Sequence, residues 1–96
     1  MKIEWDNDKN QANKKKHGVS FEEAGEIFLD PLHLSILDER FDYGEERWIT
    51  IGKTKKRLLV VAAHTWIDIN GYETVRIISA RKVTKREKKD YESYTI

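Results

Sequence analysis

The chain contains no cysteine among its 96 residues, so it can form neither a disulfide nor a zinc site built on thiolates. Its only proline is Pro31, and no stretch rich in Gly, Pro or Ser suggests a linker. No apolar run approaches the ~20 residues that a transmembrane helix needs. The first residues also lack the features of a signal peptide. We therefore expect a soluble cytoplasmic protein with one domain that spans residues 1–96.

Charge is plentiful, but it is nearly balanced. Charged residues make up 36% of the chain against 39% apolar residues, and the net charge is only +1. The basic residues concentrate in segments 9–16, 53–57 and 81–89, whereas the acids concentrate in 22–30 and 38–46. A protein with separated patches of this kind can present one basic surface to phosphate groups.

Caps, turns and periodicity predict the element order βααββββα, an α+β domain with a mainly antiparallel sheet. Capping boxes that begin at Ser20 and Thr84 open two of the helices, and Asn70-Gly71 predicts a hairpin turn. The predicted strands are 1–5, 32–36, 47–54, 58–65 and 74–80, and the predicted helices are 6–17, 20–30 and 84–93.

Two of these strands carry specific expectations about burial. Leu32, Leu34 and Ile36 alternate with polar residues, which predicts that one face of this strand is buried. The segment 58–65, LLVVAAHT, is apolar on both faces and is therefore expected to lie in the centre of the sheet.

An arginine inside an apolar strand is the most informative feature of the segment 75–92. Arg76 interrupts the run VRIISA, and an unpaired buried charge is very costly. Either the guanidinium pairs with an acid on a facing strand, such as Glu46, or this face of the sheet is open to an anionic ligand. We favour the open face.

Strand periodicity separates Arg76 from the next arginine. Arg76 shares its predicted face with Ile78 and Ala80, whereas Arg81 falls on the opposite face if the strand continues. The two arginines could serve one site only if the strand breaks at Ala80 or Arg81, before the Thr84 cap.

Several motifs together resemble the BrnT family of toxins from bacterial type II toxin-antitoxin systems. The WIDINGYET hairpin departs from the family pattern and is given no functional weight. The resemblance covers nearly the whole chain and rests on IEWDNDKNQAN, KHGVSFEEA, FLDP, GEERWITIG, LLVVAAHT and VRIISARKVTKREKKDYE.

The resemblance implies a fold similar to the RelE-like ribonuclease toxins and an activity that cleaves RNA and inhibits translation. It also implies neutralisation by a BrnA-like antitoxin with a DNA-binding domain, through which the complex would contact operator DNA. A homodimer within that complex is a further expectation.

Metal-independent RNA cleavage requires a base for the 2′-hydroxyl, cations around the phosphate and an acid for the leaving oxygen. Arginine suits the phosphate because its planar, permanently charged fork donates two hydrogen bonds. We predict Arg76 and Arg81 as the main phosphate ligands, with Arg47 as a further cation. No cofactor is expected, and the three histidines are spaced too irregularly to suggest a metal site.

His64 is the first candidate for proton transfer, followed by His17 and Glu46. Each has a structural alternative. His64 could be a satisfied buried histidine at the end of an apolar strand, and His17 could interact with a helix dipole. Because Glu46 and Arg47 adjoin, they should point to opposite faces, so only one of them should face a given site.

Further RNA contacts are predicted on the last helix and on one strand. Lys85, Arg86 and Lys89 could attract the RNA backbone, although a solvated helix face is the simpler reading. Trp48 could stack on a base or pack within the sheet. An alternative function is a non-catalytic module that binds the antitoxin and tunes its hold on operator DNA.

Overall fold

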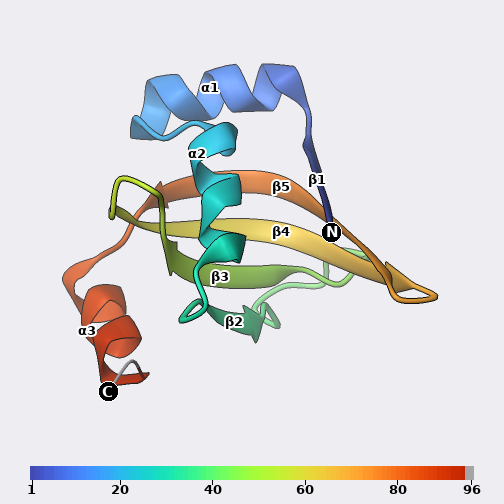
Figure 1. The fold of residues 1–96 in the computed structure, drawn as a ribbon. Coiled ribbons are helices and arrows are strands. Elements are labelled where there is room, and N and C mark those ends of the chain that lie inside the picture. Colours follow the sequence, from blue (N-terminus) through green and yellow to red (C-terminus); the bar gives the residue numbers. More distant parts are fainter. Residues whose placement is uncertain (95–96) are drawn as a thin grey trace.

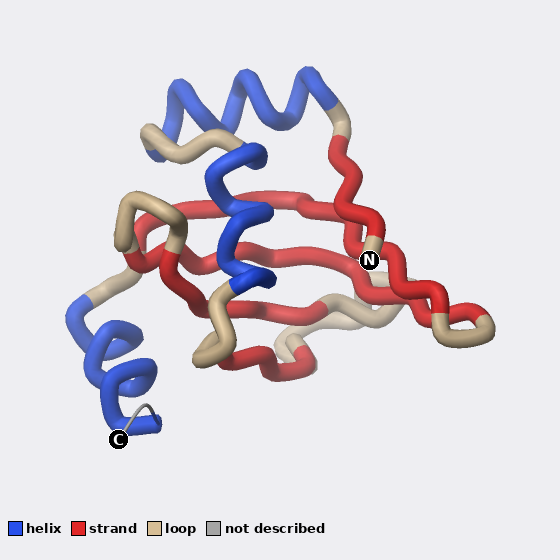
Figure 2. The backbone as a smooth tube through the Cα atoms, in the orientation of Figure 1, coloured by secondary structure: helices blue, strands red, loops and turns tan. Residues whose placement is uncertain are grey.

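A five-stranded sheet in the order β1-β5-β4-β3-β2 forms the centre of the computed structural model, which describes residues 1–94 (Figures 1 and 2). β1 pairs parallel with β5, and the other neighbours pair antiparallel. The predicted α+β class and the order βααββββα are confirmed. The elements are β1 (Lys2–Trp5), α1 (Asn7–His17), α2 (Phe21–Gly25), the 3-10 helix η1 (Glu26–Leu29), β2 (Leu34–Leu37), β3 (Trp48–Lys53), β4 (Leu59–Ile69), β5 (Tyr72–Lys82) and α3 (Lys85–Tyr94).

The β4–β5 hairpin is longer than its pattern predicts. The ladder continues to Ile69 opposite Tyr72, so only Asn70 and Gly71 remain in the turn. Both have positive φ, of 54° and 82°, as a tight two-residue hairpin requires. None of the helices in residues 1–94 has the length and apolarity needed to span a lipid bilayer.

The core lies between the sheet and the continuous unit of α2 and η1, which crosses one face of it (Figure 1). We call this side of the sheet the covered face and the opposite side the open face. Pro31 follows η1, consistent with the predicted end of this helix. The buried apolar side chains that meet here are Val19, Phe21, Ala24, Ile27 and Phe28 from the helical side and Val60, Ala62, Val75, Ile77 and Ala80 from the sheet.

The helix α1 docks through two buried asparagines instead of an apolar stripe. The side chain of Asn13 accepts a hydrogen bond from the backbone N–H of Ala80 at 3.1 Å and donates to the Ala80 carbonyl at 2.8 Å. Asn10 accepts from the backbone N–H of Phe21 at 2.8 Å. α1 therefore closes the edge of β5 beyond the short strand β1, and the predicted caps at Asp6 and Gly18 are present at its ends.

The burial predicted for the segment 32–36 is wrong. Leu32 precedes β2 and is 47% exposed, and Ile36 is 64% exposed because it pairs with Ile49 on the open face. The polar side chains turn to the covered face instead. Ser35 there shares a hydrogen bond of 2.7 Å with the fully buried Thr50, which supplies a polar neighbour that the alternation pattern does not reveal.

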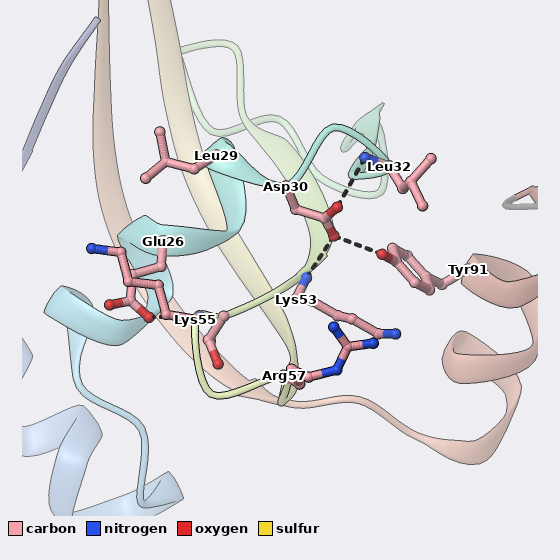
Figure 3. Close-up of a pocket in the computed structure, with 9 residues that line it drawn as sticks. Glu26, Leu29, Asp30, Leu32, Lys53, Lys55, Arg57 and Tyr91 are labelled. Carbon is pink, nitrogen blue, oxygen red and sulfur yellow. Dashed lines mark hydrogen bonds between the residues drawn. The ribbon is translucent and has the colours of Figure 1, made fainter.

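Asp30 joins three parts of the fold (Figure 3). Its carboxylate accepts hydrogen bonds from the backbone N–H groups of Leu32 and Lys53, and from the hydroxyl of Tyr91 on α3 at 2.6 Å. Burial alone would raise the pKa of Asp30, but these hydrogen bonds outweigh it and hold the pKa below its ordinary value. Burial, and then the bond to Asp30, raise the pKa of Tyr91 to about 12.

We expect Tyr91→Phe to lower the free energy of unfolding by about 1–2 kcal/mol at neutral pH, because it removes a charge-assisted hydrogen bond. Tyr94→Phe is the matched control, since Tyr94 lies on the same helix but is 76% exposed. Its effect should stay below about 0.5 kcal/mol in urea unfolding. Equal effects of the two substitutions would contradict the role assigned to this bond.

Gly52 marks the closest approach of η1 to β3. A Cβ there would lie 2.8 Å from Cβ and 2.9 Å from the carbonyl oxygen of Ile27, so Gly52→Ala should destabilise by about 1–3 kcal/mol. At Gly25 the nearest atom, in Ile3, is 3.6 Å away, and alanine should stabilise the helix by up to about 1 kcal/mol. Thermal unfolding of both variants measures this difference, and shifts of the same sign would refute it.

Candidate functional site

A β-bulge places both arginines of β5 on the open face. Ser79 pairs with Ala63 and Ile77 pairs with His64, so Ile78 is an extra residue without a partner opposite it. The bulge shifts the alternation by one position, and Arg81 then lies on the same face as Arg76. The bulge takes the place of the strand break that strict alternation would require, since β5 continues to Lys82. The predicted sharing of a face by Arg76 and Ala80 is wrong for the same reason, since Ala80 is buried on the covered face.

A concave surface of about 390 Å³ lies on the open face beside Arg81. Its walls come from the end of α1, from the β2–β3 loop and from β5, while apolar residues of β3 and β4 form its floor. We call it the basic hollow. Its lining residues are Lys16, His17, Arg40, Ile49, Val61, Ala63, Ser79, Ala80 and Arg81.

Arg81 is held in the basic hollow by Glu87 of α3. Nη1 and Nη2 of Arg81 donate to the two carboxylate oxygens of Glu87 at 2.7 Å and 2.9 Å. Glu87 also accepts from the backbone N–H of Thr84, which completes the predicted capping box. The hydrogen bonds from Arg81 lower the pKa of Glu87 to about 2, so both partners are charged at neutral pH.

Arg40 is a member of the hollow that the sequence did not reveal. Its Nε and Nη2 donate to the two carboxylate oxygens of Asp38 at 2.9 Å and 3.0 Å. Tyr43 donates to Asp38 as well, and the hydrogen bonds from Arg40 hold the pKa of Asp38 well below its usual range. Arg40 lies in a polar loop, where no spacing distinguishes it from an ordinary solvated charge. Lys16 was missed too, although its position beside His17 is a signal that could have found it.

Arg76 lies outside the hollow and is paired with Glu45. Its Nη2 is 3.2 Å from both carboxylate oxygens of Glu45, which also lies 3.5 Å from Nε of Arg47. The β2–β3 loop therefore reaches across the open face to β5. The alternative of an acidic partner for Arg76 is therefore realised with Glu45 in place of Glu46, which is itself exposed. Arg47 stacks over the ring of Tyr43 at 4.2 Å.

His64 lies on the covered face and is fully buried, so it cannot reach a ligand in the basic hollow. Its Nε2 is 2.6 Å from the Thr50 hydroxyl and its Nδ1 is 3.0 Å from the Thr65 carbonyl, which assigns the proton to Nδ1. Burial lowers its pKa below the ordinary value, and the ring of Phe28 packs against it at 4.8 Å. His64 is therefore a buried histidine with both ring nitrogens hydrogen-bonded, as the structural alternative predicts.

The predicted RNA-contacting residues do not gather in the hollow. Trp48 lies on the covered face, where its ring packs against Trp66 at a centroid distance of 5.6 Å. Lys85, Arg86 and Lys89 are exposed on α3 and line a separate shallow surface. Of the predicted site residues that the structure describes, only His17 and Arg81 line the basic hollow.

The chemistry of the hollow suits an anion. Its ionisable groups are two arginines, a lysine and a histidine, and among residues 1–94 no carboxylate lines it. The described part of the chain also contains no group of three or more His, Asp or Glu side chains placed to hold a metal ion. Fixed guanidinium groups over an apolar floor can bind a phosphate and stabilise additional charge on it.

Comparison with known proteins agrees with this fold. Residues 5–87 match the family described as the ribonuclease toxin BrnT of type II toxin-antitoxin systems. The fold is similar to the crystal structure of the Brucella abortus ribonuclease toxin BrnT, with a TM-score of 0.61 and 24% sequence identity. That match covers 88% of this chain and 99% of the other. No curated protein matches the chain.

We expect the Arg81–Glu87 pair to stabilise the fold in a pH-dependent way. The ordinary pKa of Glu87 is 4.5 and its folded pKa is about 2, so the stabilisation is complete above pH 4.5 and is lost as the pH falls towards 2. Glu87→Gln should therefore cost about 1–2 kcal/mol at neutral pH, a value limited by the partial exposure of Arg81. The gap should close near pH 2.

Urea unfolding at several pH values measures this gap. Arg81→Gln and the double variant complete a mutant cycle, in which the double variant should cost little more than either single change. Additive losses, or a gap that does not change with pH, would contradict the assignment.

Proposed function

The chain belongs to the BrnT family of ribonuclease toxins from type II toxin-antitoxin systems, and we propose that the basic hollow is where it cleaves RNA. The observation that carries this proposal is the meeting of His17, Arg40, Arg81 and Lys16 in one concave surface without a carboxylate among the described residues that line it. This set supplies a group that can transfer a proton and several groups that can bind a phosphate.

In this proposal, the 2′-hydroxyl beside the scissile phosphate attacks phosphorus while the bond to the 5′-oxygen breaks. The products are a 2′,3′-cyclic phosphate and a 5′-hydroxyl. Negative charge grows on the non-bridging oxygens during the attack, and Arg81, Arg40 and Lys16 stabilise it. No metal ion takes part, and a hollow lined by cations is a poor site for a divalent cation.

His17 replaces His64 as the group that transfers a proton. His17 is half-buried at the end of α1 and lines the hollow beside Arg81, where its imidazole nitrogens can accept or donate a proton. His17 lies in the last turn of α1, so the predicted dipole interaction and the catalytic role are compatible.

Arg76 and Arg47 are proposed to bind the RNA backbone beside the hollow. Both are on the open-face side and share Glu45, so a phosphate there must compete with a carboxylate that is partly exposed. Lys85, Arg86 and Lys89 extend the positive surface along α3. A stacking role for Trp48 is not kept, because its face of the sheet is the covered one.

A type II toxin has an antitoxin partner, and we propose that this partner is BrnA-like and carries a DNA-binding domain. The complex would then bind operator DNA through the antitoxin, with two toxin copies as its simplest symmetric form. These features follow from membership of the family and extend beyond the single chain described here.

The catalytic proposal predicts that Arg81→Ala and His17→Gln each reduce RNA cleavage by about 100-fold or more. His33→Gln is the matched histidine control, since His33 packs against Phe28 on the covered face and should stay within about threefold. The measurement is cleavage of a labelled RNA by folded variants, with product ends analysed and a chelator present in a parallel reaction.

Full activity of both hollow variants would remove this site, and loss of activity with the chelator would remove the metal-independent mechanism. An unmodified chain that binds its antitoxin but cleaves no RNA would favour the non-catalytic module.

A further inference from the structure

A second concave region lies between η1, the β3–β4 turn and α3. It consists of two adjoining cavities of about 330 and 420 Å³, which share Lys53 and Arg57 as lining residues. Figure 3 shows both side chains between the β3–β4 turn and α3, near Tyr91. We call the combined surface the α3 groove. Among the described residues, it has no lining residue in common with the basic hollow.

The α3 groove contains exposed leucines, and burying them against a partner would be energetically favourable. Leu29 is 72% exposed, Leu32 is 47% exposed and Leu58 is 45% exposed. They extend along the groove together with Leu59 and Val83. Apolar side chains with charged neighbours are the composition of a protein-binding surface, and we call these five residues the apolar strip.

Cations form the rim of this apolar strip. Five of them line the groove, from the end of β3, the β3–β4 turn, the end of β5 and α3. They are Lys53, Lys55, Arg57, Lys82 and Lys88.

The acids of the groove are already engaged. Asp30 accepts three hydrogen bonds, Glu26 accepts one from the backbone N–H of Lys55, and Glu92 has contacts of its own. The groove therefore presents a net positive rim to an incoming partner.

We propose that the α3 groove binds an acidic, leucine-bearing segment of the antitoxin. Carboxylates of such a segment would meet the cationic rim, and its apolar side chains would cover the exposed leucines. The inference rests on the antitoxin partner in the proposed function, but it does not depend on the basic hollow.

Two other occupants fit the groove less well. An RNA strand would use stacking as well as charge, yet Tyr91, the aromatic residue among the described lining residues, is only 2% exposed. A second copy of the chain packed groove against groove would bring the cations of one copy against the cations of the other.

Binding of the antitoxin encoded beside this chain, measured by calorimetry, tests the proposal. The groove variant is Lys55→Glu with Arg57→Glu, and the control is Lys85→Glu with Lys89→Glu, which makes the same charge change on exposed positions of α3. The groove variant should bind at least 10-fold more weakly and show a flatter dependence on salt. The control should bind within twofold of the unmodified chain.

Leu29→Ser tests the apolar strip without a change of charge and should weaken binding by at least threefold. All groove variants should retain their fold, as judged by thermal unfolding, and should cleave RNA within twofold of the unmodified protein. If the unmodified chain cleaves no RNA, the catalytic proposal is refuted, and the comparison of antitoxin binding still tests the groove.

Three results would overturn the inference. Unchanged antitoxin binding by the groove variants, or equal losses in the groove and control variants, would remove the surface assignment. Impaired RNA cleavage with normal antitoxin binding would assign the groove to RNA. A groove variant that changes the oligomeric state of the free chain would assign the groove to a second copy.

Discussion

The hydrogen bonds between the Asn13 side chain and the backbone of Ala80 replace those of a missing neighbouring strand. The docking of α1 and the position of the basic hollow depend on them. β1 ends at Trp5, so the last part of β5 would otherwise expose an unpaired edge. The amide of Asn13 donates to and accepts from Ala80 as a neighbouring backbone would, and it also donates to the Val19 carbonyl at 2.9 Å. A lysine-rich helix without an apolar stripe is thereby fixed to the sheet, and its last residues are carried to the rim of the basic hollow.

Ion pairs with carboxylates hold the arginines of the basic hollow in fixed positions. Glu87 and Asp38 each occupy two donors of an arginine in the basic hollow, so the guanidinium groups are oriented before a ligand arrives. Orientation of this kind reduces the entropy lost on binding, at the cost of competition between the carboxylate and the ligand. The helix α3 therefore serves two surfaces of different chemistry, because it supplies Glu87 to Arg81 and also lines the α3 groove.

Local signals in the sequence predict the elements well, because caps and turns depend on a few adjacent residues. The Asp6 and Ser20 caps, the Thr84 capping box and the Asn70-Gly71 turn are all present. The facing of side chains is less predictable, because it depends on partners distant in the sequence. Strict alternation misplaced Arg81, since a bulge is defined only against the paired strand.

Burial and loop contacts also depend on residues distant in the sequence, so the site was harder to predict than the elements. His64 was predicted to transfer protons because a histidine ends an apolar strand. Its burial depends on contacts with Thr50 and Phe28, which lie on other elements. Ser35 faces the covered side of the sheet because of the same polar neighbour, Thr50.

The parallel pairing of β1 with β5 has a consequence for synthesis, because residues 2–5 cannot pair until residues 74–77 have been made. A nascent chain therefore cannot dock α1 on Ala80 or assemble the hollow around Arg81 until both residues have left the ribosome.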